Sequence, residues 1–454
     1  MAKFQPVPTQ KGLPLLGILP KFFGRNPYEF LKNTMLEYGD FVQLNFGPQP
    51  VYLVSHPDYL QRILRDNYPN YRKPGVFYNT GREVVGNGLL TSDGDVWLRQ
   101  RRMIQPHLHR KQLESLFSNM RTAVEEILDS WQSLAENHNE IEIREKMGET
   151  TMNIITQTMF GVGTLPAREF TETTRRVAQI VKYTGGALFS DILPKWLPLP
   201  GRQEFLRDLG ILKETIHSII AKCRQDKGIS AGLIQMLINS VDEESHEQMT
   251  EKQLFDEVMT IFLAGYETTA TALTWLSIVL RDHPDVLEKL HAEIDQVLGT
   301  RIPSFEDIPR LVYVRQVFME TLRMYTVVPF LPRSANETDH LGNYYLPANA
   351  LILVFYHGVH HNPRVWDDPE VFDPGRFTPE RMASQHPFAF VPFSAGPRKC
   401  AGEEFALLEG PLVMAMLLQR YNIDVLPNQT FTPGIGATMQ PRNGVKATLS
   451  ARTL

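Results

Sequence analysis

The chain has 454 residues, 43% of them hydrophobic and 21% charged, which is typical of globular proteins and excludes intrinsic disorder. Its formal net charge of −5 offers no overall basic surface, so we expect no nucleic-acid partner. Two cysteines, Cys223 and Cys400, are too few for a disulfide framework or a four-cysteine zinc site. This composition indicates a soluble protein in a reducing compartment.

The N-terminal part of the chain mixes short helical and extended patterns. Apolar residues recur at helical spacing over residues 27–37, and alternation over residues 41–54 around a Gly-Pro turn predicts a hairpin. His56-Pro57 predicts the start of a helix that reaches about Asn67. Residues 68–95 contain five glycines and two prolines, so we expect a long loop there.

The middle of the chain is predominantly helical, and strands return towards its end. Residues 258–280 are apolar enough to resemble a membrane span, but Glu267 near the centre favours a buried core helix. A last helix is expected to begin near Gly402. The other predicted helices cover residues 96–102, 111–136, 145–160, 167–183, 203–225, 250–281, 284–298 and 311–325, and the predicted strands cover residues 333–338, 351–355, 421–426 and 445–449. The pattern predicts a predominantly α-helical α+β fold in one domain over residues 1–454, with no membrane span.

The most informative segment is Phe393-Ser-Ala-Gly396-Pro-Arg398-Lys-Cys400-Ala-Gly402, which directly precedes the last predicted helix. A cysteine ahead of a helix N-terminus has its thiolate favoured by the helix dipole and by unpaired backbone N–H groups. Gly396 permits a tight turn, and Arg398 places a cation two residues from the sulfur. For a lone cysteine, a buried free thiol would be the simpler interpretation.

The pattern Phe-x-x-Gly-x-Arg-x-Cys-x-Gly resembles the haem-binding loop of the cytochrome P450 family of haem-thiolate monooxygenases. The resemblance extends over essentially the whole chain and implies the P450 fold, with small sheets and a long central helix over the haem. It implies haem b as the cofactor and Cys400 as the ligand of its iron, since the family's thiolate donates electron density that favours O–O cleavage. By the same resemblance, Phe393 shields the sulfur, Arg398 pairs with a haem propionate, and Gly402 lies against the haem. Cys223 is expected to be an ordinary helix residue.

The segment Ala264-Gly265-Tyr266-Glu267-Thr268-Thr269 interrupts the long apolar helix. Gly and Thr inside a helix cost up to about 1 kcal/mol each relative to Ala, which indicates either a site or close helix packing. The segment is similar to the family's Ala/Gly-Gly-x-Asp/Glu-Thr pattern. That similarity implies that Ala264 lines the cofactor, that Thr268 hydrogen-bonds the oxygen species and relays protons, and that Glu267 supplies or gates them.

Other polar residues match further family positions. Trp97 and Arg101, at i and i+4, resemble the Trp-x-x-x-Arg pair that contacts a propionate, and Arg333 and His107 are additional candidates. Taken singly, each arginine would be a surface charge.

Glu320 and Arg323 lie at i and i+3, which alone indicates a solvated ion pair. Together with Phe372-Asp-Pro-Gly-Arg376, they resemble the family's structural triad. The resemblance implies that Glu320, Arg323 and Arg376 are buried and have a fold role but no catalytic one.

The resemblance also predicts a chiefly apolar substrate pocket, which indicates a lipophilic substrate. We expect a fatty acid first and a terpenoid second. The walls are expected near residues 77–90, 189–197 and 435–439, and the individual candidates are Phe77, Ile261, Phe262, Val327, Val328, Phe330, Ala437 and Thr438.

The resemblance implies insertion of one oxygen atom from O2 into a C–H or C=C bond of this substrate. No reductase domain is expected in the chain, so NAD(P)H-derived electrons would come from a separate ferredoxin or flavodoxin with its reductase. Arg398 and Lys399 would face that acidic carrier. We expect a cytoplasmic monomer. A peroxide-driven haem-thiolate peroxygenase and a non-enzymatic haem-thiolate sensor stay open as alternatives.

Overall fold

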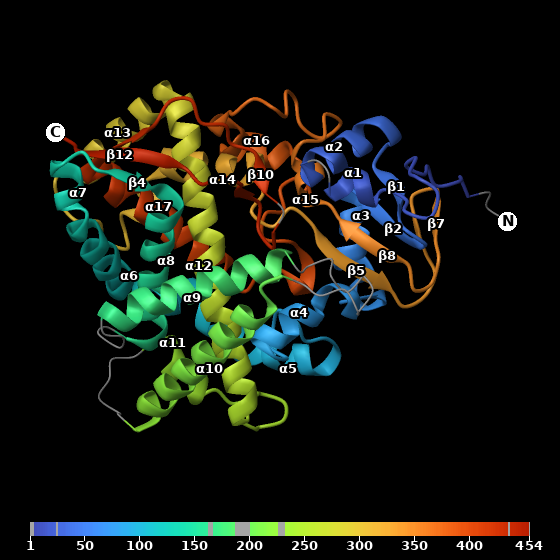
Figure 1. Cartoon of the computed structure of the whole chain (residues 1–454), viewed down its shortest axis with the longest axis horizontal. Helices are drawn as coiled ribbons and strands as arrows, with labels where there is room; N and C mark the ends of the chain where they lie inside the picture. Colours follow the sequence, from blue (N-terminus) through green and yellow to red (C-terminus); the bar gives the residue numbers. More distant parts are fainter. Residues whose placement is uncertain are drawn as a thin grey trace. The chain divides into compact units, whose positions relative to one another are not determined.

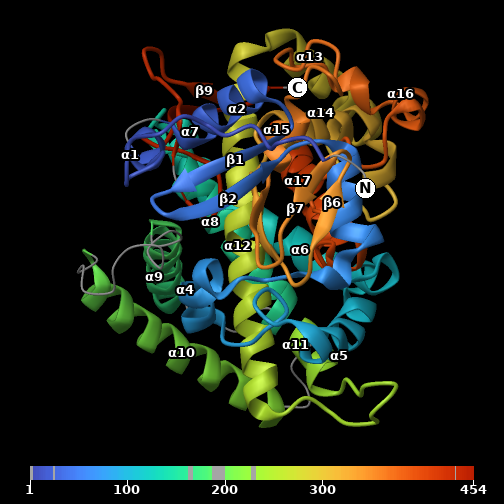
Figure 2. The same ribbon diagram turned by 90° about the vertical axis from the view of Figure 1, so that its right-hand side faces the viewer.

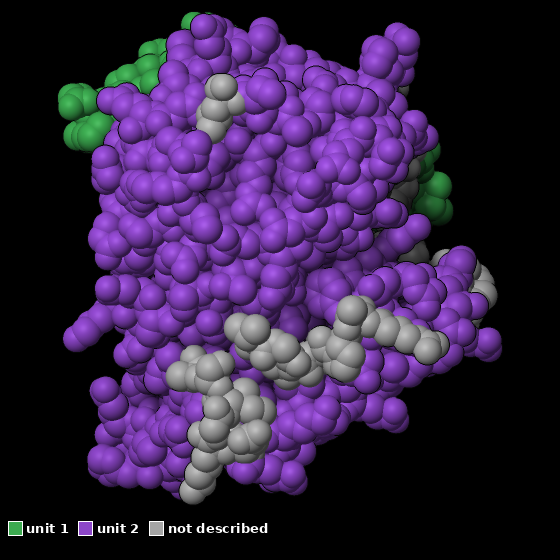
Figure 3. All heavy atoms as spheres, turned by 90° about the vertical axis from the view of Figure 1, so that its left-hand side faces the viewer, with its two compact units in different colours: residues 1–78, 319–400, 432–442 green, residues 79–318, 401–431, 443–454 purple. Residues whose placement is uncertain are grey.

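The computed structural model describes residues 4–23, 26–161, 167–186, 200–225, 232–434 and 436–453. The chain forms two compact units, each assembled from three separate stretches of sequence (Figure 3). Unit 1 contains residues 1–78, 319–400 and 432–442, and unit 2 contains residues 79–318, 401–431 and 443–454. One passage from unit 1 to unit 2 falls directly after Cys400.

Unit 1 is built on a five-stranded sheet in the order β1-β2-β8-β5-β3. Figure 1 labels β1, β2, β8 and β5 of this sheet. Strands β1 and β2 form the predicted hairpin, in which Phe41 pairs with Val54, and β8 then runs parallel to β2. The elements of unit 1 are α1 Leu19–Phe23, α2 Pro27–Tyr38, β1 Phe41–Phe46, β2 Gln49–Val54, α3 Pro57–Gln61, β3 Tyr71–Arg72, β5 Leu331–Ala335, β6 Asp339–Leu341, β7 Tyr344–Leu346, β8 Leu351–Val354, α15 Tyr356–His360, α16 Pro379–Ser384, β10 Pro433–Gly434 and β11 Gln440–Pro441.

Unit 2 is helical, and its longest element is α12, Glu251–Asp282, which runs as one helix (Figure 2). Thr250 begins it with a capping box, because its hydroxyl accepts from the Gln253 N–H while the Gln253 side chain accepts from the Thr250 N–H. The other elements are α5 Gly94–Ile104, α6 Arg110–Ser130, α7 Gln132–Glu136, β4 Glu140–Glu142, α8 Ile143–Phe160, α9 Ala167–Gly186, α10 Arg202–Gln225, α11 Leu233–Ile238, α13 Pro284–Val297, α17 Glu403–Arg420, β9 Tyr421–Val425 and β12 Lys446–Ala451. Strands β4, β12 and β9 form a three-stranded antiparallel sheet.

Two helices span a boundary between the stretches, α4 Gly75–Val85 and α14 Val312–Met324. The expectation of a long loop over residues 68–95 is wrong, because α4 occupies its centre. Phe77 and Val84 are buried seven residues apart, and so are Tyr78 and Val85, which is two helical turns. This apolar stripe outweighs the unfavourable helix propensity of Gly81.

The predominantly helical α+β class is confirmed. In the ranges that the structure describes, no helix combines the length and the apolar character needed to cross a membrane. Cys223 lies buried in α10, and burial raises the pKa of its thiol, as expected for an unreactive helix residue.

Candidate active site

The predicted site residues are divided between the two units. Unit 1 holds Arg333, Phe393, Arg398 and Cys400, together with the Glu320 cluster. Unit 2 holds Trp97, Arg101, His107, Ala264, Glu267, Thr268 and Gly402.

The cysteine loop of unit 1 folds back on itself and presents Cys400 outwards. The Cys400 N–H donates to the Phe393 carbonyl over 2.8 Å, and the Lys399 N–H donates to the Gly396 carbonyl over 3.0 Å. The Cys400 side chain is exposed, so its sulfur can approach a ligand. Gly396 adopts a φ of 70°, a left-handed conformation that the turn requires and that glycine adopts without strain.

A tyrosine that the sequence did not single out fixes the same loop. The Tyr356 hydroxyl lies 2.8 Å from the Ser394 hydroxyl, and Ser394 itself adopts a φ of 61°. Burial raises the pKa of Tyr356 to about 12, so its hydroxyl keeps its proton and can donate. This contact holds the loop at a residue whose backbone conformation is otherwise unfavourable.

One narrow strip of α12 is open while the helix around it is buried. Ala264 is exposed and Ile261 and Thr268 are partly exposed, and these three residues recur at helical spacing. The Thr268 hydroxyl donates to the Ala264 carbonyl over 2.8 Å, which places it on this strip. The neighbouring Leu263 and Thr269 are buried. The strip therefore leaves room for a flat group beside small side chains and one hydroxyl.

Gly265 serves close helix packing, the second explanation that the sequence allowed. A Cβ at this position would lie 2.8 Å from the Ile155 Cδ1 of α8. The same contact brings the Thr151 hydroxyl of α8 to 2.9 Å from the Tyr266 carbonyl of α12, to which it donates. The glycine fixes the spacing of two helices, whereas the open strip belongs to Ala264 and Thr268.

Two further α12 predictions have different outcomes. Glu267 is 7% exposed, so this residue is buried in unit 2. In the sequence it directly precedes Thr268 of the open strip. Phe262, predicted to line the substrate pocket, is fully buried with its ring centroid 5.6 Å from that of Phe160 in α8. Phe262 thus packs in the helix–helix core, whereas Ile261 lies on the strip.

The cationic candidates occupy different settings. Arg333 is only 3% exposed and donates to the Tyr78 hydroxyl over 3.1 Å and to the Pro332 carbonyl over 2.9 Å. In unit 2, Trp97 is buried and Arg101 is partly exposed, one turn apart on α5. The His107 Nε2 lies 2.7 Å from the Ser240 hydroxyl, and burial lowers the pKa of this histidine, which favours its neutral form.

The three members of the predicted triad meet in a buried cluster of unit 1. Arg323 donates to both carboxylate oxygens of Glu320 over 2.7 and 2.8 Å, and both side chains are 0% exposed. The Arg376 Nε lies 3.4 Å from the Glu320 Oε1. Arg323 and Arg376 also donate to backbone carbonyls between residues 360 and 371. The cluster thus ties an irregular stretch of chain to α14.

Several predicted pocket residues of unit 1 lie on two segments that the structure joins. The Met439 N–H donates to the Val327 carbonyl over 2.8 Å. Val327, Phe330 and Thr438 are buried, and Val328 and Ala437 are partly or fully exposed. Phe77 is buried on α4. The predicted wall at residues 189–197 lies outside the described residues, and so does residue 435.

The residues of each unit fit a haem group bound through a thiolate. Unit 1 offers an exposed cysteine sulfur at the end of a braced loop. Unit 2 offers the open strip of α12, and a Cβ added at Gly402 would meet nothing within 4 Å. A soft thiolate is an established ligand type for haem iron.

The sequence model of the family described as "Cytochrome P450" matches residues 6–446, nearly the whole chain. The chain belongs to the cytochrome P450 family. It is a P450 monooxygenase, of a family that uses haem iron and O2, and the predictions of family, fold and enzyme class are therefore confirmed.

Individual relatives match over most of their length. The cyclooctatin synthase of Streptomyces melanosporofaciens is 32% identical over 93% of this chain and 91% of its own. The chloroplastic carotene epsilon-monooxygenase of Arabidopsis thaliana is 30% identical over 93% of this chain and 81% of its own. The crystal structure of the cytochrome P450DA heme domain superposes with a TM-score of 0.89 at 22% identity, covering 99% of this chain and 98% of that one. This superposition shows the shared fold.

Proposed function

We propose that this P450 inserts one oxygen atom from O2 into a C–H or C=C bond of a lipophilic substrate, with terpenoids as the first class to test. The observation that carries the proposal is the open strip of α12, where Ile261 and Ala264 offer apolar surface beside the Thr268 hydroxyl. The names of relatives of this chain include cyclooctatin and carotene, which supports placing terpenoids before fatty acids.

Different residues of the chain would ligate the haem iron and deliver protons. Bound haem would supply the iron at which O2 is activated. The Cys400 thiolate would ligate that iron, and the hydrogen bond from its own N–H to Phe393 keeps the loop that carries the sulfur in place. The Thr268 hydroxyl would hold a proton at the oxygen side, and the Glu267 carboxyl would replace that proton.

Cationic side chains would bind the haem carboxylates. Arg333, Arg398 and Arg101 are the proposed propionate partners, with Trp97 and His107 beside them. Ile261, Val327, Val328 and Phe330 would form apolar walls around the substrate, together with Phe77, Ala437 and Thr438. Electrons would come from NAD(P)H through a separate ferredoxin or flavodoxin and its reductase.

The proposal is tested with haem-loaded protein, a ferredoxin with its reductase, NADPH and a panel of terpenoids and fatty acids. We expect at least one terpenoid to shift the Soret band and to give a product that carries one 18O atom from 18O2 and none from labelled water. Cys400→Ser is the negative control, because a hydroxyl does not replace the thiolate.

The outcome also separates the alternatives. A product formed with hydrogen peroxide alone, and unchanged in Thr268→Ala, would identify a peroxygenase instead. Binding without any product, whatever the electron donor, would identify a sensor. Turnover of fatty acids alone would reject the terpenoid assignment and keep the monooxygenase.

A further inference from the structure

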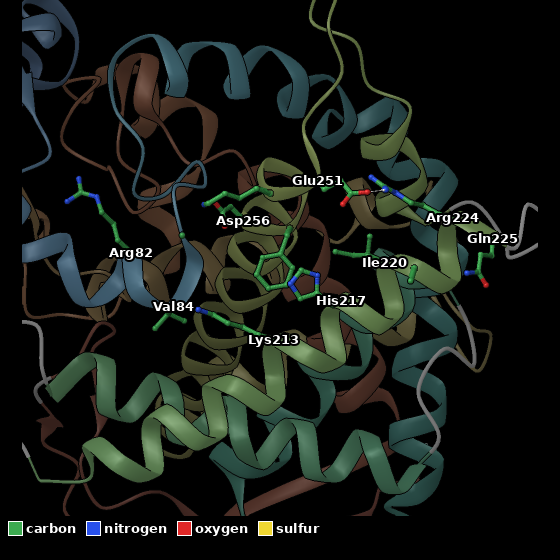
Figure 4. A pocket seen from close by; sticks show the side chains of 13 residues that line it. Arg82, Val84, Lys213, His217, Ile220, Arg224, Gln225, Glu251 and Asp256 are labelled. Carbon is green, nitrogen blue, oxygen red and sulfur yellow. Dashed lines mark hydrogen bonds and ion pairs between the residues drawn. The ribbon is translucent and has the colours of Figure 1, made fainter.

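Unit 2 contains a cavity of about 830 Å³ that none of the individually predicted haem or substrate residues lines, although Arg82, Val84 and Gly86 fall in the predicted wall near residues 77–90. Its walls come from α4, α10 and the first turns of α12, and Figure 4 shows the side chains that surround it. The volume lies in the range that accommodates small organic ligands. The lining residues are Arg82, Val84, Gly86, Lys213, His217, Ile220, Ala221, Arg224, Gln225, Glu251, Lys252, Phe255 and Asp256.

One wall is held firmly in place. The Asn87 N–H donates to the Asp256 carboxylate over 2.9 Å, and the Leu89 N–H donates to the Glu257 carboxylate over 2.9 Å. A Cβ at Gly86, whose φ is 60°, would lie 2.0 Å from the Asp256 Oδ1. The chain after α4 is thereby clamped onto α12, so this side of the cavity is formed before any ligand arrives.

The middle of the cavity is apolar and flat. The rings of His217 and Phe255 stack with centroids 3.9 Å apart and planes within 9°. Ile220 and Val84 add aliphatic surface on either side of this stack (Figure 4). An alkyl or isoprenoid body would bury apolar area against such a floor.

Most of the charges around the cavity are already neutralised. Arg224 pairs with Glu251 over 2.6 Å, and Lys252 pairs with Asp256 over 2.8 Å. Lys213 is different: its ammonium group donates to the backbone carbonyl of Glu83 over 2.9 Å. Across the described part of the chain, no carboxylate pairs with Lys213.

The nearby carboxylate of Glu83 is engaged elsewhere. Arg202 donates to both of its oxygens over 2.8 and 2.7 Å. Arg82 has only neutral contacts as well, to the Thr91 carbonyl and the Asn79 amide, but it lies apart from Lys213 in Figure 4. Lys213, next to Val84 at one end of the apolar floor, is therefore the cation available to a ligand.

From this arrangement we propose that the α4–α10–α12 cavity is a second binding site, for an amphiphile with one carboxylate group. The Lys213 ammonium would bind the carboxylate, and the His217–Phe255 stack would carry the apolar body. One compact ammonium matches one negative charge, which favours a carboxylate over a doubly charged phosphate.

The test uses haem-loaded protein and laurate, with dodecanol as the neutral probe of equal chain length and dodecyl phosphate as the phosphate probe. Binding is followed by calorimetry and by the Soret band in parallel, because we expect binding at the second site to release or absorb heat without shifting the Soret band. We expect Lys213→Met to weaken this Soret-silent binding of laurate on the order of tenfold and to leave dodecanol binding unchanged.

Three matched variants complete the test. Lys213→Arg should retain most of the affinity, and Lys222→Met, on an exposed residue of α10 that does not line the cavity, should match the wild type. Ala221→Trp should fill the cavity and abolish the Soret-silent binding of both laurate and dodecanol.

Three outcomes would overturn the proposal. They are equal laurate affinity in Lys213→Met and wild type, equal losses for laurate and dodecanol, and tighter binding of dodecyl phosphate than of laurate. The proposed monooxygenase function stands or falls separately, because its readouts are the Soret shift and the 18O-labelled product.

Discussion

Gly396 lies so close to Leu64 that a Cβ at residue 396 would stand 1.9 Å from the Leu64 carbonyl oxygen. The φ of 70° at Gly396 adds a second obstacle to any larger residue. We therefore expect Gly396→Ala to displace the loop that presents Cys400. Haem content per protein and the absorbance of the carbon monoxide complex should both fall sharply.

A matched glycine in a helix should respond in the opposite way. Gly210, in α10, has nothing within 4 Å of an added Cβ. Gly210→Ala should keep full haem content and raise the free energy of unfolding by about 0.5–1 kcal/mol, because alanine is the better helix former. A Gly396→Ala protein with normal haem content would contradict the argument from the Leu64 contact.

The Glu320 cluster predicts a large loss of stability from a single substitution. Glu320→Ala would leave the fully buried Arg323 without its carboxylate, at a cost of about 3–5 kcal/mol. Arg381→Ala removes the exposed ion pair with Asp373 and should cost less than about 1 kcal/mol. Urea unfolding followed by circular dichroism measures the loss of stability in both variants. Similar shifts of the two unfolding midpoints would show that the buried cluster stabilises the protein no more than the exposed ion pair does.

A buried acid in α17 predicts a dependence of stability on pH. Glu409 is fully buried, and burial raises the pKa of its carboxyl group to about 8, against a smaller lowering effect of the Thr269 hydroxyl. The carboxyl of the unfolded chain releases its proton near pH 4.5, whereas the folded protein keeps it until about pH 8. The protonated Glu409 carboxyl therefore makes its full contribution to the free energy of unfolding below pH 4.5, and this contribution is lost as the pH rises towards 8.

Glu409→Gln should remove this contribution. Between about pH 5 and 8, the unfolding free energy of the wild type should fall relative to that of the variant by up to about 1.4 kcal/mol per pH unit. Glu404→Gln, at an exposed position of the same helix, should keep the wild-type profile. Parallel profiles of wild type and Glu409→Gln, measured by urea titration at several pH values, would contradict the protonated state of Glu409.

The Thr268 hydroxyl on the open strip predicts an effect on how efficiently NADPH consumption is coupled to product formation. Thr268→Ala removes the proton-holding group, so the product formed per NADPH should fall on the order of tenfold while released hydrogen peroxide rises. Thr268→Ser keeps the hydroxyl and should restore most of the coupling. Oxygen consumption, peroxide and product are measured together; if alanine left the ratio unchanged, Thr268 would have no part in proton delivery.

Much of the architecture could be predicted because the local sequence patterns of the helices agree with the places that these helices take in the fold. The helix over residues 250–281 has a capping residue, an apolar body and a basic end, and the structure places α12 over Glu251–Asp282. The cysteine loop could be recognised because its chemistry fixes several residue types at once. The same loop needs positive φ angles at Ser394 and Gly396, of which only the one at Ser394 is unfavourable for its residue type.

Other features depend on contacts between residues far apart in the sequence. The burial of Phe262 against Phe160 and the packing of Gly265 on Ile155 cannot be inferred from α12 alone. The cavity at Lys213 was not predicted, because its lysine is notable only when Arg202 is seen to occupy the Glu83 carboxylate. The sequence predicts a loop in place of helix α4, because its glycines indicate a turn more strongly than its apolar stripe indicates a helix.

The interleaving of the two units limits how this protein can be divided. Each unit draws on three stretches of chain, and the N-terminal and C-terminal parts of the sequence both contribute to each. A single cut anywhere between residues 79 and 442 would leave each of the two fragments with incomplete portions of both units. Shortened versions for expression, or halves intended to reassemble in a reporter assay, would therefore have to recover two interiors simultaneously rather than one.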